Sequence, residues 1–197
     1  MEAKFEELIE GFITGNIGIS STFLSLPLAT ALQQNLLRLQ SAGQMTAAGI
    51  GKGPVKDASQ KIRSDTTCWL QNNTENDAEK EFLDIVRQFT EHLNRSCYTG
   101  LNDCEFHYAL YEEGTFYKRH TDRLRNDDNR KYSMISYLNT DWVESDGGAL
   151  RIHQNDTSST ILPTNQKTVF FRSDELEHEV EQAHRPRMSI TGWLKRI

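Results

Sequence analysis

The sequence is poor in several residue types, and each shortage excludes a class of protein. It has only three cysteines among 197 residues, Cys68, Cys97 and Cys104, and none of them forms a Cys-x-x-Cys pair. A disulfide framework and a thiolate zinc site are therefore not expected. No apolar run is long enough to span a bilayer, and the acidic start, MEAKFEELIEGFITG, lacks the basic and apolar regions of a signal peptide. We therefore expect a cytoplasmic protein with no membrane partner.

Positive charge is also in short supply. The 22 Lys and Arg residues are outnumbered by 28 Asp and Glu residues, which gives a formal net charge of −6 and a pI near 5.5. A protein whose main partner is nucleic acid needs a basic face, so the composition argues against such a partner. Hydrophobic residues make up an ordinary 37% of the chain, which at this length predicts one domain, residues 1–197, around a single core.

Helical periodicity marks the first half of the chain. Apolar residues recur at helical spacing over residues 5–12, about 22–39 and about 76–94, with Pro27 in the first turn of the second segment. Between the second and third segments, residues 42–65 are rich in Gly, Ala, Ser and Lys, and a loop of this length is often a lid or a binding loop. We interpret residues 1–100 as helical support that carries this loop.

The periodicity changes to alternation from Glu105 onward. Polar and apolar residues alternate in eight short segments: 105–111, 116–120, 132–138, 148–153, 158–163, 167–172, 176–182 and 187–195. Eight short strands at this spacing predict a jelly roll, that is, a double-stranded β-helix, over residues 105–195. The predicted fold class is α+β, mainly β, with about eight strands braced by N-terminal helices.

Two of these strands carry residues suited to a metal. The segment 116–120 ends in His120, and Asp122 follows two residues later, although such a pair arises easily by chance. His178 lies in 177-EHEVE-181, where alternation turns His178 and Val180 to the apolar face and the glutamates to the other. Each residue also fits an ordinary role, since strand ends are often solvated and an inward histidine is often a hydrogen-bonded core residue.

The last strand places a polar set on one face. Arg187, Ser189, Thr191 and Trp193 alternate with apolar residues. Such a face is costly to bury unless it surrounds a polar ligand, and the planar guanidinium of arginine matches a carboxylate. Taken alone, Arg187 fits a basic C-terminal surface equally well.

Considered together, these residues predict an iron site. Two histidines and one carboxylate form the facial triad of non-haem Fe(II) oxygenases, which leaves positions on the metal for a keto acid and O₂. His120, Asp122 and His178 supply this triad, and Arg187 follows nine residues after His178.

The chain resembles the 2-oxoglutarate- and Fe(II)-dependent prolyl hydroxylases, in particular the oxygen-sensing type and its bacterial relatives. The resemblance runs from Gln44 to Trp193. Beyond the triad, it is carried by four segments: 59-SQKIRSDTTCWL-70, 135-ISYLNTDW-142, 147-GGALRIH-153 and 187-RMSITGW-193.

The resemblance implies a role for each matching residue. His120, Asp122 and His178 would bind iron, and Arg187 would pair with the distal carboxylate of 2-oxoglutarate. The remaining cosubstrate residues would be Tyr137, Tyr111, Thr191 and Leu150, and the substrate-binding residues would be Asp65, Arg130 and Trp193. Residues 43–64 would correspond to a mobile loop over the substrate.

The activity implied is that of a 2-oxoglutarate-dependent dioxygenase acting on a proline in a protein loop, by trans-4-hydroxylation. It would use Fe(II), 2-oxoglutarate and O₂, with ascorbate as a candidate reductant and elongation factor Tu as a candidate substrate.

Two alternatives stay open. One is a non-catalytic jelly-roll binding module, against which the intact triad and Arg187 argue. The other is an oxygenase that acts on a small molecule or on nucleic acid. The nucleic-acid-dealkylating oxygenases have a last strand of the pattern Arg-x-Asn-x-Thr-x-Arg, whereas this chain has Ser189 and Trp193 at the second and fourth of those positions.

Overall fold

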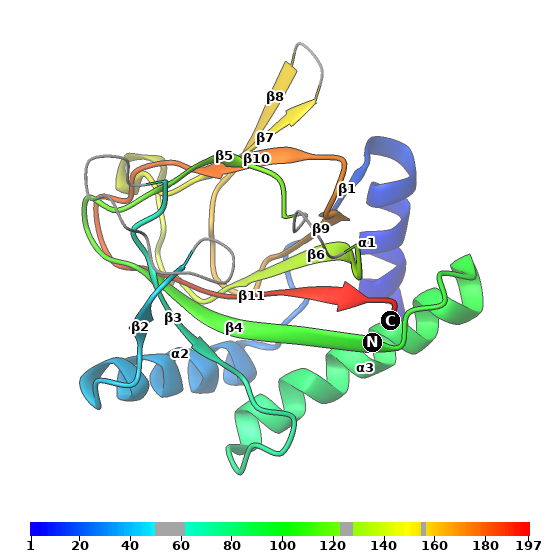
Figure 1. Ribbon diagram of the computed structural model, residues 1–197, viewed down its shortest axis with the longest axis horizontal. Coiled ribbons are helices and arrows are strands. Elements are labelled where there is room, and N and C mark those ends of the chain that lie inside the picture. The colour runs from blue at the N-terminus through cyan, green and yellow to red at the C-terminus, as the bar shows by residue number, and fades with distance from the viewer. Residues whose placement is uncertain (50–61, 123–127, 155–156) are drawn as a thin grey trace.

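Two antiparallel β-sheets face each other, and helices cover the outer face of the larger one (Figure 1). This computed structural model describes residues 1–49, 62–122, 128–154 and 157–197. The predicted class, α+β and mainly β with a jelly roll braced by N-terminal helices, is confirmed.

Among the described residues, the larger sheet has seven strands in the order β1-β9-β6-β11-β4-β3-β2, and the smaller has four in the order β5-β10-β7-β8. In that order, the larger sheet comprises Ile17–Ser20, Thr168–Arg172, Arg130–Tyr137, Arg187–Lys195, Asp103–Tyr111, Thr66–Trp69 and Thr46–Ala47. The smaller sheet comprises Tyr117–His120, Glu177–Val180, Leu150–Gln154 and Thr157–Ile161. All eight predicted strands are present, with small shifts at their ends.

Three α-helices lie within the described residues: α1 (Glu2–Gly15), α2 (Leu26–Ser41) and α3 (Asp77–Cys97). Local capping sets where two of them begin. The hydroxyl of Ser25 accepts a hydrogen bond from the Leu28 N–H, and Pro27 lies in the first turn of α2 as predicted. Asn76 caps α3 in the same way. A short 3-10 turn, Glu144–Asp146, precedes β7.

The first third of the chain is less helical than predicted. Ile17–Ser20 forms β1, and the predicted loop contributes β2 and borders β3, which no alternation signalled. These strands are short, and β1 pairs with β9, far along the chain, so only tertiary structure stabilises it. Residues 50–61 of the predicted substrate loop lie outside the described residues.

Apolar clusters of the described residues hold the layers together. Apolar side chains of the helices pack against one face of the larger sheet, including Phe106, Leu110 and Ile190. A smaller cluster that includes Tyr137, Leu150 and Ile152 fills part of the space between the sheets. The alternation of the last strand is therefore confirmed, because Ile190 faces the helices and Arg187 faces the smaller sheet.

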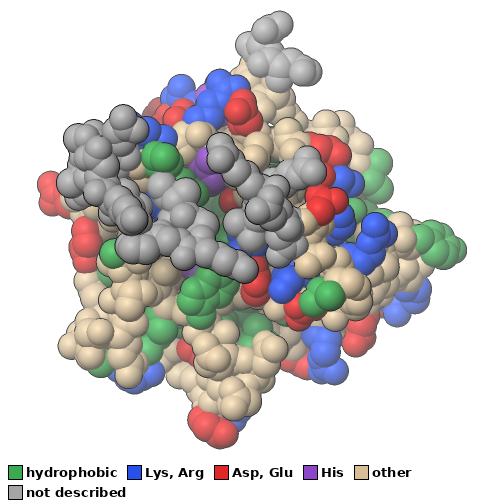
Figure 2. All heavy atoms as spheres, in the orientation of Figure 1, with side chains coloured by type: hydrophobic (Ala, Val, Ile, Leu, Met, Phe, Trp, Pro, Cys, Tyr) green, Lys and Arg blue, Asp and Glu red, His purple; other side chains and the backbone are tan. Residues whose placement is uncertain are grey.

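The surface and the thiols agree with the composition. Basic and acidic side chains are interspersed over the face shown in Figure 2. Cys68, Cys97 and Cys104 are free. In the part of the chain that the structure describes, no helix combines the length and the apolar character needed to cross a membrane.

Candidate active site

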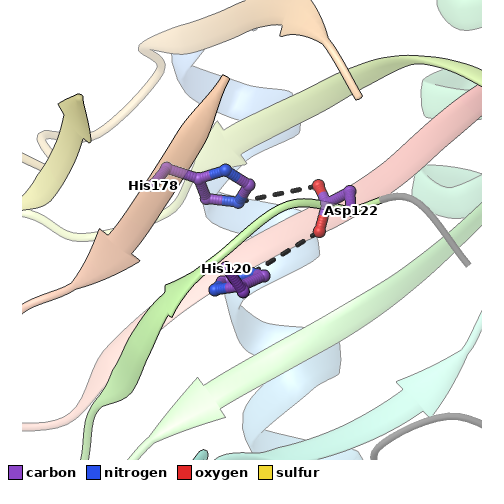
Figure 3. Close-up of side chains that lie close together, drawn as sticks. All are labelled: His120, Asp122 and His178. Atoms are coloured by element: carbon purple, nitrogen blue, oxygen red, sulfur yellow. Dashed lines mark ion pairs between the residues drawn. The ribbon is translucent and has the colours of Figure 1, made fainter. Parts of the chain in front are cut away.

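Three side chains from the smaller sheet converge between the two sheets (Figure 3). His120 ends β5, Asp122 follows it, and His178 lies in β10 directly opposite His120 in the strand pairing. His120 Nε2 lies 3.5 Å from Asp122 Oδ1, and His178 Nε2 lies 3.6 Å from Asp122 Oδ2. One ligand atom from each residue falls within 4.8 Å of the others, which is close enough for the three to share an ion.

Backbone carbonyl groups determine which nitrogen each imidazole offers. His120 Nδ1 lies 2.7 Å from the Lys118 carbonyl oxygen, and His178 Nδ1 lies 3.1 Å from that of Leu176. A carbonyl oxygen only accepts, so Nδ1–H donates in each ring and Nε2 keeps its lone pair for the space beside Asp122. The ring of Tyr117 stacks on His120 with centroids 3.5 Å apart, which fixes the plane of that imidazole.

The protonation states also suit a metal. Burial raises the pKa of Asp122, but the facing imidazoles of His178 and His120, with Ser133, outweigh it and hold that pKa well below its usual range. Ser133 Oγ donates to Asp122 Oδ2 at 2.7 Å. Burial lowers the pKa of His178, and the charge of Asp122 opposes this only in part. A carboxylate and a neutral imidazole are the forms that bind metal ions.

Arg187 is the first residue of β11, and it is buried beside two tyrosines. It is only 1% exposed, its Nε donates to the Gly148 carbonyl oxygen at 2.7 Å, and its guanidinium carbon lies 5.0 Å and 5.1 Å from the ring centroids of Tyr111 and Tyr137. Arg187 Nη2 and the Tyr137 hydroxyl find no hydrogen-bond partner among the described residues. Burial raises the pKa of Tyr137 to about 12, although Arg187 acts in the opposite direction. An unpaired guanidinium N–H beside a neutral hydroxyl offers two hydrogen-bond donors to a carboxylate.

The other predicted cosubstrate residues lie around Arg187. Leu150 is fully buried and belongs to the same cluster as Tyr137. Thr191 lies further along β11, with its hydroxyl oxygen 3.2 Å from that of Ser189. Gly148 has φ +61°, and a Cβ there would meet Arg187 Cδ at 3.0 Å, so the glycine leaves room for the arginine. The contact of each residue with 2-oxoglutarate stays a prediction.

The predicted substrate residues are paired with neighbouring side chains. Arg63 donates to both carboxylate oxygens of Asp65, from Nε at 2.8 Å and from Nη2 at 2.6 Å. Arg130 donates from Nε to Glu105 at 2.8 Å, and its guanidinium carbon lies 3.4 Å from the ring centroid of Trp193. Their roles in substrate binding stay predictions.

Several residues beside the site were missed by the sequence analysis. His107 in β4 lies opposite Thr191 of β11, on the site-facing side of the larger sheet. The alternation of 105-EFHYALY-111 could have found it, because it places His107 and Tyr111 on one face. Ser133 and Tyr117, which hold Asp122 and His120, carried no signal of their own.

The donor atoms fit the two groups that the triad and Arg187 predict. Two imidazoles and one carboxylate suit Fe(II) and leave coordination positions open. The unpaired atoms of Arg187 and Tyr137 suit the distal carboxylate of a keto diacid such as 2-oxoglutarate.

The sequence matches the 2OG-Fe(II) oxygenase superfamily over residues 106–195. Egl nine homolog 1 of Rattus norvegicus is 32% identical over 148 residues, which are 70% of this chain and 43% of that protein. The Homo sapiens protein of the same name is also 32% identical, and the match covers 34% of its length. The chain thus spans less than half the length of these relatives.

Solved structures agree over nearly the whole chain. A Pseudomonas putida prolyl-4-hydroxylase has a TM-score of 0.88 at 32% identity, covering 98% of this chain and 99% of that one. A Trichoplax adhaerens prolyl hydroxylase, in complex with a hypoxia-inducible-factor peptide, has a TM-score of 0.88 at 23% identity, covering 99% and 90%, and supports the fold alone. The family implies Fe(II), 2-oxoglutarate and O₂, and the His-Asp-His group fits iron. The chain therefore belongs to the 2OG-Fe(II) oxygenase superfamily, among its prolyl-4-hydroxylase-like members.

Proposed function

We propose that this chain hydroxylates a prolyl residue in a protein substrate, at carbon 4 of the ring. The observation that carries the proposal is that His120, Asp122 and His178 converge on one side of a site whose other side holds the unpaired atoms of Arg187 and Tyr137. The Pseudomonas putida relative, which is 32% identical, is named a prolyl-4-hydroxylase, which supports a prolyl substrate.

The residues of this chain hold and orient the reactants. The two Nε2 atoms and the Asp122 carboxylate bind the iron, while the carbonyls of Lys118 and Leu176 keep both imidazoles in the required tautomer. Arg187 and Tyr137 would hold the distal carboxylate of 2-oxoglutarate and so orient this cosubstrate in the site. When bound, iron and 2-oxoglutarate supply the oxidation, in which O₂ provides one oxygen atom to succinate and one to the substrate, with loss of CO₂.

Leu150, Tyr111 and Thr191 complete this assignment as residues that line the cosubstrate. Leu150 and Tyr111 are buried and exclude water from the ion pair with Arg187. Asp65, Arg130 and Trp193 contact the protein substrate. We propose that the chain works as one domain and in the cytoplasm, with ascorbate as a reductant.

Elongation factor Tu is the candidate substrate, since bacterial members of the group that this chain resembles are associated with it. The test incubates purified protein with Fe(II), 2-oxoglutarate, ascorbate and elongation factor Tu, and searches by mass spectrometry for one added oxygen on a proline. Asp122→Asn is the matched control, because it keeps the shape of the side chain and removes its charge.

Three outcomes separate the alternatives. An oxygenated proline that is absent with the Asp122→Asn variant supports the proposal. Succinate without any modified proline would refute the choice of substrate and favour a small-molecule or nucleic-acid oxygenase. Absence of succinate with every substrate would favour a non-catalytic binding module.

A further inference from the structure

His107 lies beside the candidate active site without belonging to the iron group or the Arg187 group. The strand pairing places Trp69, His107 and Thr191 opposite one another across β3, β4 and β11. The ring centroid of His107 lies 4.8 Å from that of Trp69 and 5.5 Å from that of Trp193. His107 is only 3% exposed, whereas Trp69 is 47% exposed, so the neighbouring ring of Trp69 connects the buried His107 to the surface.

Two ring nitrogens in this group are buried without a partner. His107 Nδ1 and Trp193 Nε1 find no hydrogen-bond partner among the described residues. A buried polar atom that is left unpaired loses its hydrogen bond to water without replacement, so each atom favours a ligand that supplies its partner. The indole nitrogen can only donate. A ligand that satisfies it must therefore bring an acceptor.

The surroundings of His107 favour its neutral imidazole. Burial lowers its pKa to about 3, with Arg63 and Arg130 acting in the same direction and Asp122 in the opposite one. A neutral imidazole carries one N–H and one acceptor nitrogen. Beside the indole donor, an accepting Nδ1 completes a donor and acceptor pair. In an extended main chain the N–H and the carbonyl oxygen of one residue point to the same side, so a single residue presents the complementary donor and acceptor.

We propose that His107 is a specificity-determining residue that binds the main chain of the substrate, with Nδ1 accepting from the N–H of one residue while Trp193 Nε1–H donates to the carbonyl oxygen of the same residue. This inference rests on the proposed function, because this main chain must belong to a substrate that enters beside the iron. Proline has no N–H of its own, so the N–H adjacent to its carbonyl belongs to the following residue. His107 therefore binds the main chain on the C-terminal side of the target proline.

The test uses two probes that differ in a single donor. N-acetyl-L-proline methylamide carries the N–H, and N-acetyl-L-proline methyl ester lacks it. Each is titrated into protein loaded with Zn(II) and 2-oxoglutarate, which gives no turnover, and binding is followed by the ¹⁵N resonances of the histidines. The spectrum of the His107→Met variant assigns the His107 signals.

The expected result is that the methylamide shifts the Nδ1 resonance of His107 and binds about tenfold more tightly than the ester. His107→Met removes the preference between the two probes, and His107→Gln, which keeps an acceptor, restores part of it. The restoration distinguishes a hydrogen bond from a packing role.

Three results would overturn the inference. They are equal affinity of the two probes for the wild type, a preference that persists in His107→Met, and no binding of the methylamide. Failure of the proposed function has a different signature. In that case the iron-loaded protein makes no succinate from 2-oxoglutarate, while the amide preference at His107 is still observed.

Discussion

His107 should make the protein sensitive to acid, and its replacement by methionine should relieve that sensitivity. The folded state holds the pKa of His107 near 3, against 6.5 for the ordinary value expected in the unfolded chain. Between these values the unfolded chain binds a proton that the folded protein does not, so the free energy of unfolding decreases as the pH falls below 6.5. The slope from one such group is about 1.4 kcal/mol per pH unit.

The magnitude follows from the two pKa values. Lowering the pH from 6.5 by about two units should cost the wild type about 2 kcal/mol more than the His107→Met variant. The assay is urea unfolding of the metal-free protein at a series of pH values. His107→Gln is the control, because it also removes the titrating group but adds no apolar side chain. Parallel stability curves for the wild type and both variants over this pH range would refute the reasoning.

Further predictions concern Tyr137, the ring over His120 and one close backbone contact. Tyr137→Phe removes a buried hydroxyl that has no hydrogen-bond partner among the described residues, so the metal-free variant should be at least as stable to heat as the wild type. Calorimetry should show that its affinity for 2-oxoglutarate is reduced about fivefold. Tyr117→Leu removes the ring stacked on His120 and should weaken Fe(II) binding about tenfold in competition with a chelator, whereas Tyr117→Phe should not. Gly18→Ala would place a Cβ 2.1 Å from the carbonyl oxygen of Leu8 in α1, and should lower stability to urea by about 1–3 kcal/mol. Gly15→Ala, where a Cβ meets nothing within 4 Å, is its control.

The sequence predicted the elements whose signals are local. Apolar spacing predicted α2 and α3, with Pro27 in the first turn of α2, and alternation predicted the strands of the jelly roll. His120, Asp122 and His178 could be proposed together because two histidines and one carboxylate are a recognisable metal-binding set. The structure places the three in contact distance.

The features that were missed depend on partners distant in the chain. Strand β1 exists because Ile17 pairs with Phe171 of β9, and four residues cannot show that preference by themselves. The pairing of Asp65 with Arg63, and the burial of His107 against Trp69 of β3, likewise required the tertiary structure. Alternation could have indicated which face of the strand His107 lies on, but not how deeply it is buried.

The central claim is that one site binds Fe(II) through the three-residue group and 2-oxoglutarate through Arg187. The most direct measurement is an anaerobic titration of the purified protein with Fe(II) and 2-oxoglutarate, following the visible charge-transfer absorption of the chelated keto acid. We expect the band in the wild type, no band in His178→Ala, and a band in Arg187→Met that needs about 100-fold more 2-oxoglutarate. No band in the wild type, or equal 2-oxoglutarate dependence in Arg187→Met, would contradict it.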